Sequence, residues 1–216
     1  MWDQNITGLD NAGTFRSLNG AANESIFQGR ASKAGYFCFF KVWRDMPYDA
    51  VLDHDGNMYR VEVKGTNGDH FDVTRGGRSG AQIKRGKSRE RLIKRDDCDF
   101  VVGVDSANGD CYIIPTDIIE IINRKSLHKE AVIDFKEKWD LFKFEGDNCG
   151  SVNRMTKEQT RDGLRNLPLA EVNTIASGLG VTIPAGDIKI NRHRVYLSDP
   201  MDKLIYAIWT KLAGIK

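Results

Sequence analysis

The 216-residue sequence predicts an α/β fold, a small mixed sheet flanked by helices, followed by a small, mainly helical C-terminal domain. Two observations lead to this expectation. Between residues 21 and 148, stretches with strand-like alternation lie between stretches with helical spacing of apolar residues. Further along the chain, helical spacing dominates. We therefore divide the chain into an N-terminal arm (1–20), a core (21–148) and a C-terminal domain (149–216).

The core opens with a predicted helix and a predicted hairpin. Apolar residues recur with helical spacing after Asn23, a suitable N-cap, so we expect a helix over about 23–35 that could run to 42. A short apolar run at 48–51 and an alternating run at 58–64 flank an Asp-Gly turn, which is typical of a hairpin. The second run alternates between a polar and an apolar face: Met58, Arg60, Glu62 and Lys64 against Tyr59, Val61 and Val63.

The remaining core continues this mixed order. The expected elements are a strand at 71–74, a short basic helix at 82–94, strands at 99–104 and 111–114 around an Asn108-Gly109 turn, and a helix at 118–124. Residues 75–80 are too glycine-rich for regular structure.

In the C-terminal domain, helical spacing covers 156–164, 169–179 and 202–212, with an alternating run at 187–197 that could form a small hairpin. This outline is that of small nucleic-acid-binding modules such as SAP-like domains. An apolar stripe on the last helix would instead suit dimerisation or packing: Leu204, Ile205, Ile208, Trp209 and Leu212.

Composition excludes several protein classes. Hydrophobic residues make up 40% of the chain, enough for a packed core, and no apolar run reaches the roughly 20 residues of a membrane span. The polar N-terminus lacks a secretory signal, and four scattered cysteines suit neither a disulfide scaffold nor a zinc site. These three features lead us to expect a cytoplasmic protein. No nucleotide-binding P-loop is present, so we expect no nucleotide cofactor.

Positive charge is concentrated in one segment. Residues 75–95 hold nine Lys or Arg against Glu90 alone, a net charge of +8 in a chain whose total is +2. Such density indicates a phosphate-binding surface, although a solvated face could carry it equally well. The candidate DNA-binding residues are Arg75, Arg78, Gln82, Lys84, Arg85, Lys87 and Arg89.

A possible catalytic constellation lies on the predicted hairpin. Period 2 places Glu62 and Lys64 on one face of the second strand, and the turn brings Asp49 beside them. Two neighbouring carboxylates are most easily kept ionised by a hard divalent cation, and Mg²⁺ could take both together with the Val63 carbonyl and waters. Lys64 could then orient a metal-activated water and stabilise transition-state charge.

The run Pro47-Tyr48-Asp49, twelve further residues and Glu62-Val63-Lys64-Gly65 resembles the signature of the PD-(D/E)XK nuclease superfamily. The resemblance covers about residues 22–122 and is strongest to a phage and mobile-element branch of homing endonucleases and resolvase-like proteins. It implies a restriction-endonuclease-like core, with Mg²⁺ (or Mn²⁺) held by Asp49 and Glu62 and the attacking water positioned with Lys64. Many members also carry a glutamate on the first helix, which would be Glu24; alternatively, Glu24 is an ordinary first-turn glutamate.

We therefore expect a Mg²⁺-dependent, site-specific endonuclease of double-stranded DNA that leaves 5′-phosphate and 3′-hydroxyl ends. Two alternatives remain open, a resolvase of branched DNA and a non-catalytic DNA-binding protein on the same fold. Because cutting both strands usually requires two active sites, we expect a homodimer or homotetramer. The family resemblance indicates a prokaryotic or phage-infected host cell, and no membrane association is expected.

Overall fold

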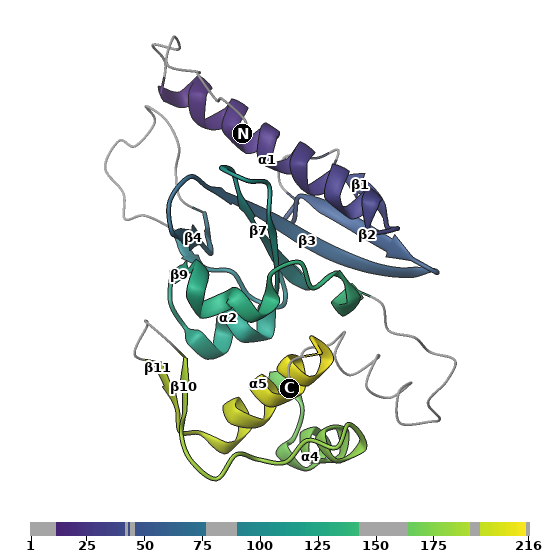
Figure 1. Cartoon of the computed structure of the whole chain (residues 1–216), viewed down its shortest axis with the longest axis vertical. Helices are drawn as coiled ribbons and strands as arrows, with labels where there is room; N and C mark the ends of the chain where they lie inside the picture. The colour runs from purple at the N-terminus through teal and green to yellow at the C-terminus, as the bar shows by residue number, and fades with distance from the viewer. Residues whose placement is uncertain are drawn as a thin grey trace.

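The computed structural model describes residues 12–41, 43, 46–76, 90–142, 164–190 and 195–214. Its centre is a five-stranded mixed sheet in the order β1-β2-β3-β7-β8 (Figure 1). The strands are β1 (Phe37–Phe40), β2 (Ala50–His54), β3 (Asn57–Thr66), β7 (Phe100–Asp105) and β8 (Cys111–Pro115). All neighbours are antiparallel except β3 and β7, which run parallel. The predicted α/β class is confirmed.

The β2–β3 hairpin matches its prediction closely. Asp55 and Gly56 form a two-residue turn with positive φ angles of 52° and 78°, the conformation that Asp-Gly turns favour. Along β3 the apolar residues Tyr59, Val61 and Val63 are buried, and the alternating polar residues are not. The strand therefore presents an apolar face to the core and a polar face that is partly exposed.

The N-terminal helix is longer than predicted. Helix α1 (Ala12–Lys33) begins eleven residues before Asn23, so residues 12–20 of the expected arm are helical. Asn23 is buried inside the helix instead of capping it; its Oδ1 accepts from Ser106 Oγ at 2.8 Å. A Cβ on Gly65 of β3 would overlap the Asn23 side chain, so this glycine lets α1 lie directly on the strand. The possible extension to residue 42 is wrong, since 37–40 form β1.

The connection from β3 to β7 contributes strands to two small sheets. Strand β4 (His70–Asp72) pairs with β9 (Ser126–His128), and β5 (Thr74–Arg75) pairs with β6 (Arg91–Leu92). The expected strand at 71–74 is thus split between two sheets outside the central one. A basic helix at 82–94 is wrong at its C-terminal end, where 91–92 are extended; residues 77–89 lie outside the described part.

The second half of the core follows the predicted order. Helix α2 (Thr116–Ile122) comes directly after β8 and ends at Asn123, which has a left-handed φ of 50°. Two 3-10 segments that the sequence did not indicate, η1 (Lys129–Phe135) and η2 (Trp139–Phe142), then add Phe135 and Phe142 to the core.

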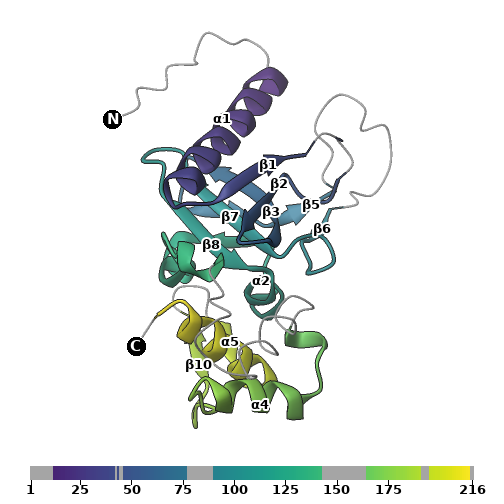
Figure 2. The ribbon, with the colours of Figure 1, turned by 90° about the vertical axis from the view of Figure 1, so that its right-hand side faces the viewer.

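The C-terminal region joins the same hydrophobic core. It comprises η3 (Leu164–Asn166), α4 (Leu169–Gly178), the hairpin β10 (Ile188–Ile190) and β11 (Val195–Leu197), and α5 (Pro200–Leu212). The last two predicted helices and the small hairpin are confirmed; Asp199 caps α5 by accepting from Met201 N. In Figures 1 and 2 the sheet and α2 lie between α1 and the C-terminal helices. Most of the expected 156–164 helix lies outside the described residues.

The apolar stripe of α5 is used within the chain. Leu204, Ile205, Ile208 and Trp209 are each at most 1% exposed, and the Trp209 ring lies 5.9 Å from Phe100 of β7. This stripe therefore packs against the chain's own core and does not offer a surface for dimerisation. Among the described residues, no helix is long and apolar enough to cross a membrane.

Candidate active site

Asp49 lies where β2 begins, and its carboxylate accepts a hydrogen bond from a β3 residue that lies beyond the end of β2. Its backbone N–H donates to Val61 O at 2.8 Å, the first bond of the β2–β3 ladder. One step further along β3, Val63 N–H has passed the end of β2 and donates to Asp49 Oδ2 at 2.8 Å. The side chain is therefore fixed by the strand end, and the residue is only 7% exposed.

Glu62 and Lys64 project from the polar face of β3, as their spacing predicted. Lys64 Nζ donates to Glu62 Oε1 at 2.8 Å. Both side chains line a cleft of about 360 Å³, together with Lys41, Met46, Asp72, Thr74, Arg75, Gly76 and Glu90. The alternation of β3 thus separates core residues on one face from a polar cleft on the other.

Three carboxyl groups interact at this site. Burial raises the pKa of Glu62; Asp49 raises it further, while Lys64 and Lys41 oppose the shift. Burial also raises the pKa of Glu24 on α1, again with a contribution from Asp49 and opposition from Lys41. The structure thus brings Glu24, Asp49 and Glu62 into one electrostatic cluster. The catalytic role of Glu24 stays a prediction.

The backbone adds a carbonyl to this donor set. In a strand the N–H and C=O of one residue point to the same side, so the Val63 carbonyl faces the side on which Asp49 receives the Val63 N–H. Within the described residues no three His, Cys, Asp or Glu side chains form a metal-binding group. Two carboxylates, one carbonyl and waters are nevertheless the kind of oxygen set that suits Mg²⁺, which usually retains several waters.

Lys41 is a site residue that the sequence analysis missed. It follows β1, its Nζ donates to Asp49 Oδ1 at 2.6 Å, and its backbone N–H donates to Asp49 O at 2.9 Å. Burial opposes its charge, but the hydrogen bond to Asp49 and the nearby Glu62 and Glu24 outweigh burial and raise the Lys41 pKa. The predicted helix, which could run to 42, does not place Lys41 beside Asp49; the pairing depends on β1 lying next to β2.

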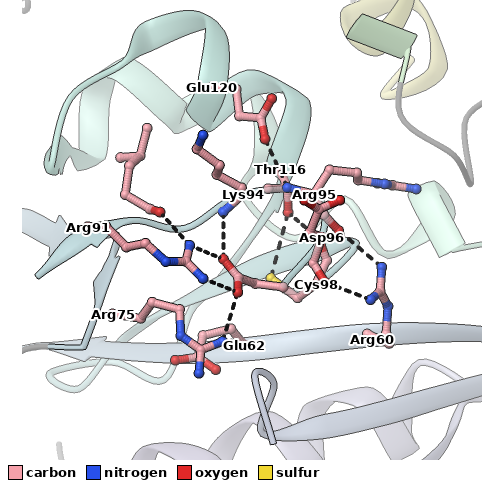
Figure 3. A network of polar contacts seen from close by, with 12 residues as sticks. Arg60, Glu62, Arg75, Arg91, Lys94, Arg95, Asp96, Cys98, Thr116 and Glu120 are labelled. Carbon is pink, nitrogen blue, oxygen red and sulfur yellow. Dashed lines mark hydrogen bonds and ion pairs between the residues drawn. The ribbon is translucent and has the colours of Figure 1, made fainter. Parts of the chain in front are cut away.

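Arg75, the first residue of the basic segment, lines the cleft. Its Nη1 donates to Asp97 Oδ1 at 2.9 Å, while Arg91 makes a two-pronged contact with both Asp97 oxygens at 2.6 Å (Figure 3). Burial raises the pKa of Asp97, but hydrogen bonds from Arg91 and Lys94 N outweigh it, so the pKa is lowered. One buried carboxylate therefore orients two arginines, of which Arg75 lines the cleft beside Glu62.

The basic segment is not uniformly available to a ligand. Arg95 is only 6% exposed; its Nη1 donates to Asp99 O at 2.9 Å and its backbone N–H to Glu120 Oε1 at 2.9 Å (Figure 3). Arg95 therefore holds the turn before β7 against α2. The other predicted DNA-binding residues lie outside the described part of the chain: Arg78, Gln82, Lys84, Arg85, Lys87 and Arg89.

No family model and no curated protein matches the sequence. Among solved structures, the chain is similar to a bacterial homing endonuclease, I-Ssp6803I, with 22% sequence identity and a TM-score of 0.49. The match covers 58% of this chain and 90% of that one.

Proposed function

We propose that the protein is a Mg²⁺-dependent endonuclease that hydrolyses phosphodiester bonds of double-stranded DNA at specific sites, with Mn²⁺ able to substitute. The supporting observation is the arrangement on one hairpin of Asp49, Glu62 and Lys64, with the Val63 carbonyl on the Asp49 side. The 5′-phosphate and 3′-hydroxyl ends are part of this proposal through the motif resemblance.

In this proposal Asp49, Glu62 and the Val63 carbonyl hold the cation. The bound metal supplies a Lewis acid that activates water and neutralises charge at the phosphate. The Val63 N–H fixes the orientation of Asp49, and Glu62 holds the Lys64 ammonium at 2.8 Å. Lys64 positions the attacking water and stabilises the negative charge that develops on the phosphate.

Charge balance makes productive DNA binding dependent on the cation. The cluster contains three carboxylates (Glu24, Asp49, Glu62) and two ammonium groups (Lys41, Lys64), a formal charge of −1. This charge repels a phosphodiester, whereas a divalent cation changes the sum to +1 and attracts one. Arg75 at the cleft and the basic segment beyond it would hold the flanking backbone. Cutting both strands would use two copies of the chain.

Digestion of plasmid and phage DNA tests the proposal. Wild-type protein in Mg²⁺ should give discrete fragments, and chelation of the metal or Glu62→Ala should abolish them. Glu171→Ala, which removes an exposed glutamate of α4, is the matched control and should cut normally. Mapping the ends would test the proposed 5′-phosphate. A smear would contradict site specificity, and faster cleavage of a four-way junction than of linear duplex would favour a resolvase. Absence of cutting in Mg²⁺ and Mn²⁺ on every substrate would overturn the proposal.

A further inference from the structure

Lys41 contacts Asp49, a candidate metal ligand, through both its side chain and its backbone. Its ammonium lies 2.6 Å from Asp49 Oδ1, and its backbone N–H binds the Asp49 carbonyl at 2.9 Å. The Lys41 side chain is 26% exposed and that of Asp49 10%, so solvent screens this pair only partly. Since the backbone bond fixes the base of Lys41, the ammonium can leave Asp49 without the strand moving.

The surroundings of this ammonium are those of a cation site. The carboxylates of Asp49, Glu62 and Glu24 all act on it, and Lys64 is the other ammonium of the same cleft. Lys64 is already paired with Glu62 at 2.8 Å. Lys41 is therefore the positive group that balances Asp49 in the absence of metal.

Both carboxylate oxygens of Asp49 already accept a hydrogen bond, so a metal cation would have to share an oxygen with an existing donor. Oδ2 accepts the Val63 N–H and Oδ1 accepts from Lys41. A divalent cation bound through Oδ1 would meet the ammonium at the same oxygen, and like charges at this range repel strongly in a partly buried site. One of the two cations must therefore give way.

We propose that Lys41 is an exchangeable internal counter-ion: it positions Asp49 in the metal-free protein and is displaced when the divalent cation binds. The inference rests on the proposed function, because it takes Asp49 as a metal ligand. A fixed lysine that supports Asp49 in both states would act in the opposite direction. Removing an exchangeable counter-ion tightens metal binding, whereas removing a fixed support weakens it.

Calorimetric titration of Mn²⁺ and Mg²⁺ without DNA separates these two roles. In Lys41→Gln, which retains a neutral donor, the Kd for metal should fall about tenfold, the effect typical of one neighbouring unit charge. Lys41→Arg keeps the charge and should bind metal like the wild type. The matched control is Lys136→Gln, which removes another 2.6 Å lysine–carboxylate pair, to Asp110, from outside the cleft lining. It should leave the Kd unchanged.

Thermal unfolding supplies a second measurement. Without metal, Lys41→Gln should melt at a lower temperature than the wild type, because Asp49 loses its counter-ion; saturating Mn²⁺ should raise its Tm by more than that of the wild type. If Lys41→Gln does not fold, Lys41→Met is titrated in its place.

The possible outcomes distinguish the two proposals. Metal binding by the wild type with an equal or weaker affinity in the uncharged variants would overturn the counter-ion role and leave the nuclease proposal standing. No metal binding by wild type or variants would instead overturn the proposed metal-dependent function itself.

Discussion

At the residue scale, Asp49 has a structural role at the end of the hairpin, and in the proposed function it would also bind the cation. Strand β2 begins just after it, and its carboxylate accepts the Val63 N–H that a strand starting earlier would have paired. The other oxygen faces Lys41 and the cleft cluster. The carboxylate is thereby held at the strand end by two donors, the Val63 N–H and the Lys41 ammonium. Rigid positioning of this kind is what a metal-dependent reaction needs from its ligands.

Substitution of Lys64 should abolish cleavage and leave DNA binding largely intact. In Lys64→Ala the ammonium beside Glu62 is lost, so the attacking water is no longer oriented and cleavage should be abolished. DNA binding should stay within a few fold of the wild type, since Arg75 and the basic segment are intact. Gel-shift titration in Mg²⁺ beside a digestion assay measures both quantities. Parallel loss of binding and cleavage would contradict the assigned role.

Glu62 should destabilise the metal-free protein at neutral pH. Burial raises its pKa, so its stabilising contribution is complete below the ordinary glutamate pKa and is lost as pH rises through the folded-state value. Without metal, Glu62→Gln should therefore have a higher Tm than the wild type near neutral pH. This difference in Tm should disappear as the pH is lowered. Added Mg²⁺ should reverse the order, because only the carboxylate gains from the cation.

Differential scanning fluorimetry across pH, with and without Mg²⁺, makes this measurement. Glu171→Gln is the control for loss of one glutamate charge from an exposed position. A metal-free Glu62→Gln less stable than the wild type near neutral pH would contradict the assigned direction of the pKa shift.

At the element scale, the sequence pattern predicted the elements whose structure depends on neighbouring residues in the chain. The Asp-Gly turn and the alternation of residues 58–64 specify the β2–β3 hairpin, and hence which face carries Glu62 and Lys64. The start of α1 and the identity of β1 depend on packing against the sheet. Asn23 resembles an N-cap in sequence, yet its amide is paired with Ser106, 83 residues away. No local pattern contains such a contact.

Pairing between residues far apart in the sequence also decides which charged side chains are accessible to a ligand. Lys41 meets Asp49 only because β1 lies beside β2, and Arg95 is removed from the surface by Asp99 and Glu120. A count of charges along the sequence treats Arg75 and Arg95 alike. The fold places the first at the cleft and the second inside the molecule.

Gly65 should be essential for docking α1. In Gly65→Ala the new Cβ would overlap the buried Asn23 side chain, whose amide is held at both ends by Asn19 O and Ser106 Oγ. Overpacking of this kind costs about 1–3 kcal/mol. We expect a loss of that size in the free energy of unfolding, together with slower cleavage because Glu24 moves with the helix.

The control is Gly29→Ala, in the same helix, where an added Cβ meets nothing within 4 Å. That change should stabilise the protein by about 0.5–1 kcal/mol, since alanine favours the helix. The double variant Asn23→Ala/Gly65→Ala should recover part of the lost stability in urea denaturation. If Gly65→Ala unfolds like the wild type, the close approach does not constrain α1.

At the scale of the whole molecule, one apolar core links the β2–β3 hairpin to the C-terminal helices. Tyr59 on β3 contacts Phe100 on β7, and Phe100 contacts Trp209 on α5. Trp209 Nε1 also donates to Asp117 Oδ2 of α2 at 3.1 Å, a bond in the buried interior. Because this chain of contacts starts on the strand that carries Glu62, loss of the C-terminal packing should also disturb the candidate site.

We therefore expect Trp209→Ala to lower the stability of the entire chain. The side chain is 1% exposed, and truncating a buried tryptophan costs about 3–5 kcal/mol. The variant should unfold in a single transition at lower temperature, and cleavage should disappear at that same temperature. Tyr196→Ala on β11, which removes a 57% exposed aromatic residue, should change neither. Two separate transitions, with cleavage surviving the first, would instead show that the C-terminal region unfolds independently of the sheet that carries the site.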